Sequence, residues 1–334
     1  MKVNNFLSKG KYIMLPTKQS PKVYLNISDN NIKYNSFKLY NPFSLKARIL
    51  KSLVLNVNLF TNRLNNYNSE KKGKFIKYLE NIFNRSIDSS IYISTDKNKI
   101  ILQLQNNDDI IVYCKVGINE LGIKRLENEK HAIVLLKDNP YFKVPKIIGS
   151  GEWNSYYYLI FEPIEIKKVY LEKSELQKIL KSLYKNLSHP LNRHPRIIKL
   201  YKFFKDRDCH KFIENMNKYL LNNNIPTKEV YEHGDFAPWN ITKNNNNLYL
   251  FDFEHFEERG IENLDMLKYF FQIQYLLKKK KKKELVKYLK KLKIKNIEIF
   301  TIIFLLSEIK NKIEEKKDYR FYESLLNLWL KEIE

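Results

Sequence analysis

The segment that most constrains the fold begins at His233. It reads His-Gly-Asp-Phe-Ala-Pro-Trp-Asn, continues as ITKNNNNLYL and ends with Phe-Asp-Phe-Glu. β-forming residues on both sides of an asparagine run predict a short strand, a turn and a return strand. This hairpin would bring Asp252 back beside Asn240, which itself lies five residues after Asp235. The chain is therefore expected to gather one amide and two carboxylates in one place.

These three groups have the chemistry that phosphoryl transfer from a nucleotide requires. One carboxylate positions and deprotonates the attacking hydroxyl, while an amide oxygen and a second carboxylate hold the magnesium ions that neutralise the phosphates. The hairpin predicts Asn240 and Asp252 as the metal ligands. The plainer alternative is a satisfied polar turn, because Gly-Asp pairs are common in turns.

A Lys and a Glu upstream strengthen the catalytic interpretation. Lys115 lies in the strand-like run DIIVYCKVG, where alternation with buried β-branched residues would direct it into a cleft. Glu129 lies in RLENEKHAIVLL, a run with helical spacing, one turn before Ile133. A strand Lys paired with a helix Glu grips the α- and β-phosphates of a nucleotide. Taken alone, a residue of either kind is more often a surface charge.

Two further segments are candidates for contact with the nucleotide. The strand-like run YYYLIFEPI ends at Glu162, where a backbone carbonyl could accept from adenine, and at Ile164, whose N–H could donate. Pro163 lacks an N–H, but it falls between the two positions required. In YISTDKNKIILQL, residues Ser94, Thr95 and Asp96 occupy the place of a phosphate-covering loop.

From about Tyr92 to Phe271 the chain resembles the aminoglycoside phosphotransferase and choline kinase superfamily, whose fold is similar to that of protein kinases. The resemblance implies that Asp235 is the catalytic base, with His233 and Gly234 fixing its turn. It also implies ATP and Mg²⁺ as cofactors. Asp265 in NLDMLKYFF matches the buried Asp that opens the next helix. HGDFAPWN with DFEHF looks closest to uncharacterised bacterial phosphotransferases of surface-polysaccharide gene clusters. The chain departs from the pattern at the phosphate-covering loop, which contains no glycine.

The predicted fold class is α+β, a bilobal protein-kinase-like fold with an extra N-terminal α/β extension. With 334 residues, the chain exceeds the size at which one core usually keeps growing. We expect an N-terminal extension over 1–88, a small, mostly-β nucleotide-binding lobe over 89–165 and a larger helical lobe over 166–334 that carries the catalytic loop and substrate site. Within the extension, strands are predicted at 11–16, 22–27 and 37–41, and helices at 44–60 and 69–83, with Ser44 and Ser69 as their N-caps.

Charge and cysteine content bear on partners and location. Sixty basic and 37 acidic residues give a net charge of +23, and Lys278–Lys283 are six consecutive lysines. We interpret this tract as solvated surface, with contact to an anionic membrane surface as the alternative. Nucleic acid is disfavoured, because the basic tract contains no Arg. Cys114 and Cys209 are expected to be reduced structural thiols. The absence of a signal peptide and of a long apolar run predicts a cytoplasmic protein.

Three functions compete. The leading prediction is an ATP- and Mg²⁺-dependent kinase that phosphorylates a hydroxyl of a small molecule, such as an aminoglycoside, an amino alcohol or a cell-surface sugar. A pseudokinase that serves as a nucleotide-binding or scaffold module is the alternative. A protein kinase is disfavoured, because the chain after Asp252 runs almost directly into a helix and leaves no room for an activation segment. Acidic residues in that stretch could attract a cationic acceptor or form an ordinary solvated loop; they are Glu254, Glu257, Glu258 and Glu262.

Overall fold

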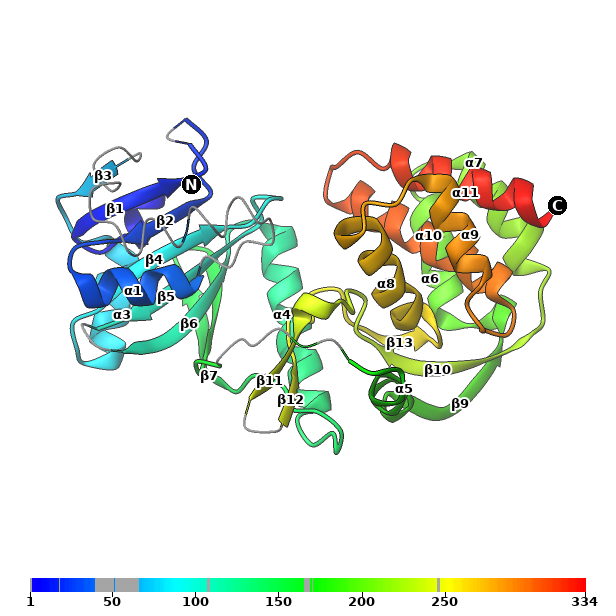
Figure 1. The fold of residues 1–334 in the computed structure, drawn as a ribbon, viewed down its shortest axis with the longest axis horizontal. Helices are drawn as coiled ribbons and strands as arrows, with labels where there is room; N and C mark the ends of the chain where they lie inside the picture. Colours follow the sequence, from blue (N-terminus) through cyan, green and yellow to red (C-terminus); the bar gives the residue numbers. More distant parts are fainter. Residues whose placement is uncertain are drawn as a thin grey trace. The chain divides into compact units, whose positions relative to one another are not determined.

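A computed structural model describes residues 2–17, 19–39, 51, 66–106, 109–164, 169, 171–244 and 247–334. The chain divides into two compact units: Met1–Lys130 with Pro145–Ile164, and His131–Val144 with Glu165–Glu334. The first unit contains a large antiparallel sheet and the second is mainly helical (Figure 1). The predicted α+β class is therefore confirmed.

The first unit is built on an eight-stranded antiparallel sheet with the order β3-β1-β2-β4-β5-β6-β8-β7. Its strands are β1 (Gly10–Leu15), β2 (Val23–Asn26), β3 (Asn66–Ser69), β4 (Asp88–Ile93), β5 (Lys99–Gln105), β6 (Ile110–Gly117), β7 (Ile147–Trp153) and β8 (Tyr156–Phe161). The strands of the N-terminal extension continue the sheet of the predicted nucleotide-binding lobe, because β2 pairs with β4. Residues before 88 therefore share a sheet with those after it.

Helices cover both faces of this sheet. Alternation along β1 sends Tyr12 and Met14 into the core that contains α3 (Lys74–Phe83), and Ile13 and Leu15 into the core that contains Phe37 of α1 (Asn30–Leu39). A 3-10 turn, η1 (Val3–Phe6), packs beside α3. The helix α4 (Glu120–Leu136) follows β6 directly. The period-2 pattern of β1 is therefore that of a strand buried on both sides.

Three local predictions in the extension need comment. The strand predicted at 37–41 is wrong, because residues up to Leu39 belong to α1, which begins where Asp29 Oδ1 accepts from the N–H of Ile32 at 2.8 Å. Ser69 is not a helix cap; it ends β3, and α3 begins after Gly73. The predicted helix at 44–60, apart from Lys51, lies outside the described residues.

The second unit is mainly helical, as predicted, and α10 packs against α6, α8, α9 and α11 (Figure 1). Its helices are α5 (Lys173–Ser182), α6 (Pro195–Lys205), α7 (His210–Met216), α8 (Leu264–Gln272), α9 (Lys282–Lys290), α10 (Ile297–Glu314) and α11 (Arg320–Ile333), with 3-10 turns η3 (Leu191–Arg193) and η5 (Pro238–Asn240) and π-helical turns η4 (Asn217–Leu221) and η6 (Ile273–Leu277). Leu, Ile and Phe side chains from these helices form one core around the fully buried Trp329.

The prediction of a helical lobe missed a three-stranded antiparallel sheet. Its order is β13-β10-β9, formed by Glu257–Ile261, Pro226–Glu232 and Tyr184–Pro190. The strand β10 leads directly into His233, so this sheet supports the start of the candidate catalytic loop. These strands are rich in polar and charged residues, so the sequence shows no regular apolar alternation that would have predicted them.

Two expectations from composition can be compared with the structure. Cys114 and Cys209 form no disulfide with each other; Cys114 is buried, and burial raises the pKa of its thiol. Among the described residues, no helix combines the length and apolar character needed to cross a bilayer.

Candidate active site

The predicted hairpin is present and brings the two candidate metal ligands together. Strand β11 (Ile241–Asn244) pairs with β12 (Asn247–Leu250), and Ile241 lies opposite Leu250. Just beyond this pair, the N–H of Phe251 donates to the carbonyl of Asn240 at 3.2 Å. Asp252 is the next residue. The local spacing of the sequence was therefore sufficient to predict that Asn240 and Asp252 are neighbours.

Asn240 is oriented by the residue predicted to be the base. Its Nδ2 donates to the backbone carbonyl of Asp235 at 2.8 Å and to Oδ2 of the same residue at 3.2 Å. Because both contacts need an N–H donor, they assign which end of the amide is nitrogen. The other end, Oδ1, is a hard oxygen ligand of the kind that Mg²⁺ prefers.

Hydrogen bonds to Asp265 and a required glycine fix the turn that carries Asp235. Gly234 has φ +76°, and a Cβ there would lie 2.1 Å from the carbonyl oxygen of His255, so only glycine fits. The carboxylate of Asp265 accepts from the N–H of His233 at 2.7 Å and from that of Gly234 at 2.9 Å. Asp265 lies in the first turn of α8, the position that the resemblance implied.

His233 acts on this turn as a neutral spacer. Its Nδ1 accepts from the N–H of Asp235 at 3.3 Å, and its Nε2 lies 3.2 Å from the carbonyl of Phe251. These partners assign the proton to Nε2. Burial lowers the pKa of His233 to about 4, so the ring is uncharged at neutral pH. His233 therefore joins the loop of Asp235 to the segment that precedes Asp252.

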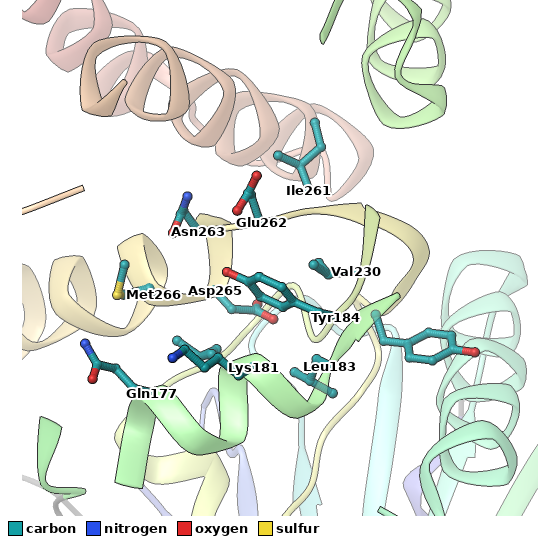
Figure 2. Close-up of a pocket in the computed structure, with 12 residues that line it drawn as sticks. Gln177, Lys181, Leu183, Tyr184, Val230, Ile261, Glu262, Asn263, Asp265 and Met266 are labelled. Carbon is teal, nitrogen blue, oxygen red and sulfur yellow. The ribbon is translucent and has the colours of Figure 1, made fainter. Parts of the chain in front are cut away.

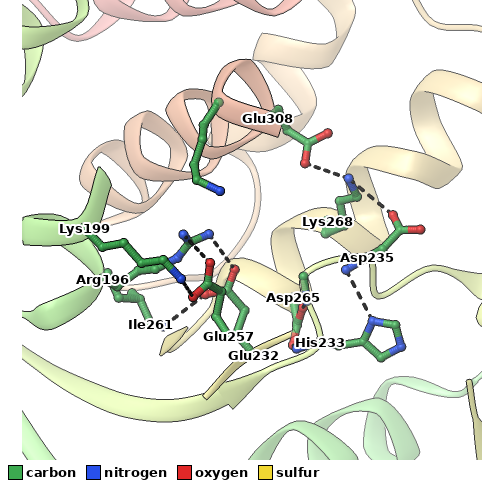
Figure 3. A network of polar contacts seen from close by, with 12 residues as sticks. Arg196, Lys199, Glu232, His233, Asp235, Glu257, Ile261, Asp265, Lys268 and Glu308 are labelled. Atoms are coloured by element: carbon green, nitrogen blue, oxygen red, sulfur yellow. Dashed lines mark hydrogen bonds and ion pairs between the residues drawn. The ribbon is translucent and has the colours of Figure 1, made fainter. Parts of the chain in front are cut away.

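Charged groups around Asp235, the predicted base, have opposing effects on its pKa. Burial raises the pKa of Asp235, the charge of Lys268 lowers it, and the charges of Asp252 and Glu308 raise it. The net shift is upward. Burial and the charge of Glu232 raise the pKa of Asp265, and the N–H groups of His233 and Gly234, which donate to it, lower it. Lys268 lies 3.4 Å from Oδ1 of Asp235 (Figure 3).

Lys268 and Glu308 are absent from the sequence-based list of site residues. Glu308, on α10, is 40 residues from Lys268, and their side chains are 2.7 Å apart. A signal existed for Lys268 alone, because it stands three residues after Asp265 and so lies on the same face of a helix. No such spacing indicates Glu308.

Asp252 has an unusual backbone conformation. Its φ is +69°, in the left-handed region that costs most residues energy but that Asp tolerates better than others. Non-glycine residues in this region are concentrated at functional sites. The conformation turns the chain at the end of the hairpin, immediately after the hydrogen bond from Phe251.

In the first unit, the structure brings together Lys115 and Glu129. Lys115 lies on β6, opposite Ile101 of β5 and Leu159 of β8, and its Nζ is 2.8 Å from each carboxylate oxygen of Glu129 on α4. The Glu129 side chain is 1% exposed and that of Lys115 is 13% exposed. The pair predicted from order along the chain is therefore formed, with its ammonium near the surface.

The turn between β4 and β5 contains Ser94 and Thr95. Ser94 is buried, and its Oγ donates to Asp96 and accepts from the N–H of Lys99, while Thr95 is exposed. Asp96 forms a buried ion pair with Arg125 of α4 at 3.0 Å. Lys97, with φ +56°, takes the left-handed conformation that a glycine would otherwise supply. This turn is tied to α4, and its contact with a nucleotide stays a prediction.

The segment after β8 contains Glu162 and Ile164. The N–H of Glu162 donates to the carbonyl of Lys146 at 3.1 Å, which continues the pairing of β7 with β8, and its side chain forms an exposed ion pair with Lys146. Ile164 is the last residue of the first unit. Contact of these two residues with adenine stays a prediction.

The acidic residues after Asp252 mostly have partners inside the second unit. Glu257 binds Arg196 at 3.0 Å and Lys199 at 2.6 Å, and the Arg196 side chain is 4% exposed (Figure 3). Glu262 accepts from the N–H of Lys228 at 2.9 Å. Glu257 therefore neutralises cations of the protein and Glu262 is held by a backbone N–H, while attraction of a cationic acceptor by the group stays a prediction.

A cavity of about 160 Å³ lies beside Asp265 (Figure 2). It is lined by residues of α5, β9, β10, β13 and the start of α8, including Lys181, Tyr184 and Glu262. Sites for drug-sized ligands commonly have about 300–1,000 Å³. The volume is too small for a nucleotide, and both carboxylate oxygens of Asp265 are already engaged by backbone N–H groups.

The lysine tract Lys278–Lys283 joins η6 to α9. Part of it packs on the protein, because the Lys280 ammonium lies 5.0 Å from the ring centroid of Tyr288 and that of Lys282 lies 5.5 Å from that of Phe321. Lys282 also contacts Ser324. Solvated surface, with contact to an anionic membrane surface as the alternative, stays a prediction for this tract.

Comparisons with protein-family models and with the sequences of curated proteins find no match. Solved structures of small-molecule phosphotransferases are similar to this structure at low sequence identity. The GDP and kanamycin complex of APH(2")-IIia has a TM-score of 0.48 and 11% identity, over 77% of this chain and 97% of that one. A fructosamine-3-kinase homologue from Haemophilus somnus 129PT has a TM-score of 0.44 and 12% identity, over 77% and 96%. Macrolide 2'-phosphotransferase type I has a TM-score of 0.46 and 9% identity, over 75% and 94%.

Proposed function

We propose that this protein is an ATP- and Mg²⁺-dependent phosphotransferase that moves the γ-phosphate of a nucleotide to a hydroxyl of a small molecule. One observation carries the proposal. Asp235 stands on a turn that Asp265 clamps, and it contacts Asn240, which the hairpin places next to Asp252. A carboxylate, an amide and a second carboxylate in this arrangement suit proton abstraction beside a magnesium site.

Each residue then has a stated role. Asp235 accepts the proton of the acceptor hydroxyl, and its aim is set by the turn below it. Asn240 and Asp252 supply hard oxygen ligands for Mg²⁺, which neutralises phosphate charge when bound.

Lys115, held by Glu129, directs an ammonium at the phosphates. Glu162 and Ile164 supply the backbone groups for adenine, and Ser94 and Thr95 lie in the loop over the phosphates.

A small acceptor is favoured over a protein. The stretch between Asp252 and α8 is occupied by β13, which pairs with β10. A protein kinase would need an activation segment here to hold its substrate. An aminoglycoside, an amino alcohol or a cell-surface sugar remains the predicted class, and the resemblance of HGDFAPWN to phosphotransferases of surface-polysaccharide gene clusters supports the last of these.

A pseudokinase is the second candidate, favoured by the glycine-free loop at Ser94–Asn98. Against it, the chain keeps Lys115, Glu129, Asp235, Asn240 and Asp252 together. The two functions differ in one measurable respect, because a binding module takes up nucleotide and does not transfer phosphate.

The test is a turnover screen with Mg²⁺ and ATP against panels of sugars, aminoglycosides and amino alcohols, followed by two variants. Asp235→Asn keeps shape and removes the proton acceptor, so turnover should fall by about 10² to 10⁴ with nearly unchanged ATP affinity. Asp252→Ala should abolish the Mg²⁺-dependent rise in melting temperature that ATP gives the wild type.

Two results would contradict the proposal. Wild-type protein that binds ATP with Mg²⁺ and phosphorylates none of the acceptors, with no turnover for Asp235→Asn to remove, would favour the pseudokinase. Turnover that survives Asp235→Asn unchanged would show that another group takes the proton.

A further inference from the structure

The base contacts a buried cation that comes from a different element. Lys268 Nζ lies 3.4 Å from Asp235 Oδ1 and 2.7 Å from Glu308 Oε1 (Figure 3). Lys268 stands on α8 one turn after Asp265, which holds the backbone of the same loop. One helix therefore reaches the catalytic loop twice, once at its N–H groups and once at the Asp235 side chain.

The ammonium is enclosed by protein. The side chains of Lys268 and Glu308 are 9% and 6% exposed, whereas that of Asp235 is 27% exposed. A buried lysine is costly unless carboxylates compensate for its lost hydration. Burial lowers the pKa of Lys268, but the charges of Glu308 and Asp235 raise it by more than burial lowers it. The net shift is therefore upward. Lys268 is therefore charged at neutral pH.

Glu308 anchors this cation from the far side. It lies on α10, which packs against α8, and it neighbours Tyr322 of α11. Burial, followed by the charge of Glu308, raises the pKa of Tyr322 well above its usual value. With Glu308 fixed among three helices, the ammonium has little freedom to leave Asp235.

The two oxygens of Asp235 are thereby held from two directions. Oδ1 meets Lys268, and Oδ2 meets Nδ2 of Asn240 at 3.2 Å. We propose that Lys268, anchored by Glu308, is a positioning residue that fixes the carboxylate of Asp235 for the phosphotransfer proposed above. This inference rests on that proposed function. A misplacement of about 1 Å in a catalytic group can cost about 10²-fold in rate, so fixing this carboxylate matters.

The alternative is an ion pair that only stabilises the helices. A matched control separates the two, because Lys310 on α10 is also 9% exposed at its side chain and pairs with Glu314 at 2.9 Å. Lys268→Met and Lys310→Met each remove one buried ammonium and keep a side chain of similar length. Lys268→Arg restores the charge at the first site.

Once the turnover screen has identified an acceptor, Lys268→Met should lower kcat by about 10²-fold. The KM for that acceptor and the Kd for ATP should stay within about threefold of the wild-type values. Lys268→Arg should recover at least a tenth of wild-type kcat, and Lys310→Met should stay within about twofold of it. Folded Lys268→Met with the same kcat as Lys310→Met would overturn the proposal. If Lys268→Met does not fold, Glu308→Gln replaces it, with an expected fall of about tenfold in kcat.

A second measurement needs no acceptor and so separates this inference from the proposed function. Backbone amide NMR relaxation should show added motion at Gly234, Asp235 and Phe236 in Lys268→Met and wild-type behaviour there in Lys310→Met. Unchanged relaxation at these amides would reject the positioning role, even if the wild type transfers no phosphate. Altered relaxation together with absent transfer would reject the proposed function alone.

Discussion

Each unit of the molecule contains a buried Lys–Glu ion pair, and the two pairs differ in the contacts of their lysine. In the first unit, Lys115 on a central strand binds both oxygens of Glu129 at 2.8 Å. In the second, Lys268 on a helix binds Glu308 at 2.7 Å and also reaches Asp235 at 3.4 Å. The pairs have similar burial and the same chemistry, but the second shares its cation with another carboxylate.

The difference indicates how each cation is used. Lys115 contacts both oxygens of Glu129 and its side chain is 13% exposed, and the proposed function gives its charge a role toward a bound nucleotide. Lys268 is divided between two carboxylates, so its charge is consumed inside the protein. We therefore expect the first pair to act on the nucleotide and the second on the base.

Of the two pairs, Lys115 with Glu129 has the larger expected effect. Under the proposed function, Lys115→Met with Glu129→Gln should lower kcat/KM for ATP by about 10² to 10³, because the cation proposed to act on the phosphates is removed. Steady-state kinetics at varied ATP concentration would measure this. The comparison fails if this double variant lowers kcat/KM no more than Lys310→Met does.

Stability should respond differently from activity at the same pair. Lys115→Met alone leaves the buried Glu129 carboxylate without that ammonium and should cost about 3 kcal/mol of unfolding free energy. Adding Glu129→Gln should recover most of that loss without restoring turnover. Urea unfolding of the single and double variants would measure both values. Equal stabilities would show that Glu129 does not depend on Lys115.

Unlike the lysines of these two ion pairs, His194 is a buried base that stays neutral at neutral pH. Burial, with the charge of His189, lowers its pKa to about 4 from 6.5. The unfolded chain therefore takes up a proton at higher pH than the folded protein does. The contribution to stability is complete above about pH 6.5 and is lost as the pH falls toward 4, by about 2 kcal/mol at pH 4.5.

His194→Asn supplies the matched control for this effect. His194 Nδ1 accepts from the N–H of Arg196 at the start of α6, and an Asn oxygen can make the same cap without titrating. The wild type should lose about 2 kcal/mol more than this variant between pH 7 and pH 4.5 in urea unfolding. Parallel curves would contradict the assignment.

The smallest effect is expected from exposed lysines. Replacing Lys278–Lys283 by alternating Gln and Ser should leave turnover of a soluble acceptor within about twofold, because salt screens exposed charges beyond about 8 to 10 Å. Sedimentation with anionic liposomes, before and after the replacement, tests the alternative. Binding that disappears with the lysines would support contact with a membrane surface.

The sequence by itself determined the local parts of the site. Turn chemistry and strand propensity predicted the hairpin that joins Asn240 to Asp252. Alternation and helical spacing predicted the strand of Lys115 and the helix of Glu129, and the order typical of kinases predicted that the two residues meet. These features depend on neighbours within a few residues, or on one strand followed by one helix. The periods of strand and helix were enough to predict the elements themselves, whereas the pairing of Lys115 with Glu129 was predicted from the arrangement typical of kinases.

Tertiary structure alone decided the rest. The pairing of β2 with β4, the sheet of β9, β10 and β13, and the contact between Lys268 and Glu308 all join residues far apart in the chain. Each of these segments has a plausible local alternative: a separate extension, a helical lobe or an exposed lysine. Which one forms depends on which surfaces are buried against each other, and the local pattern of residues does not contain that information.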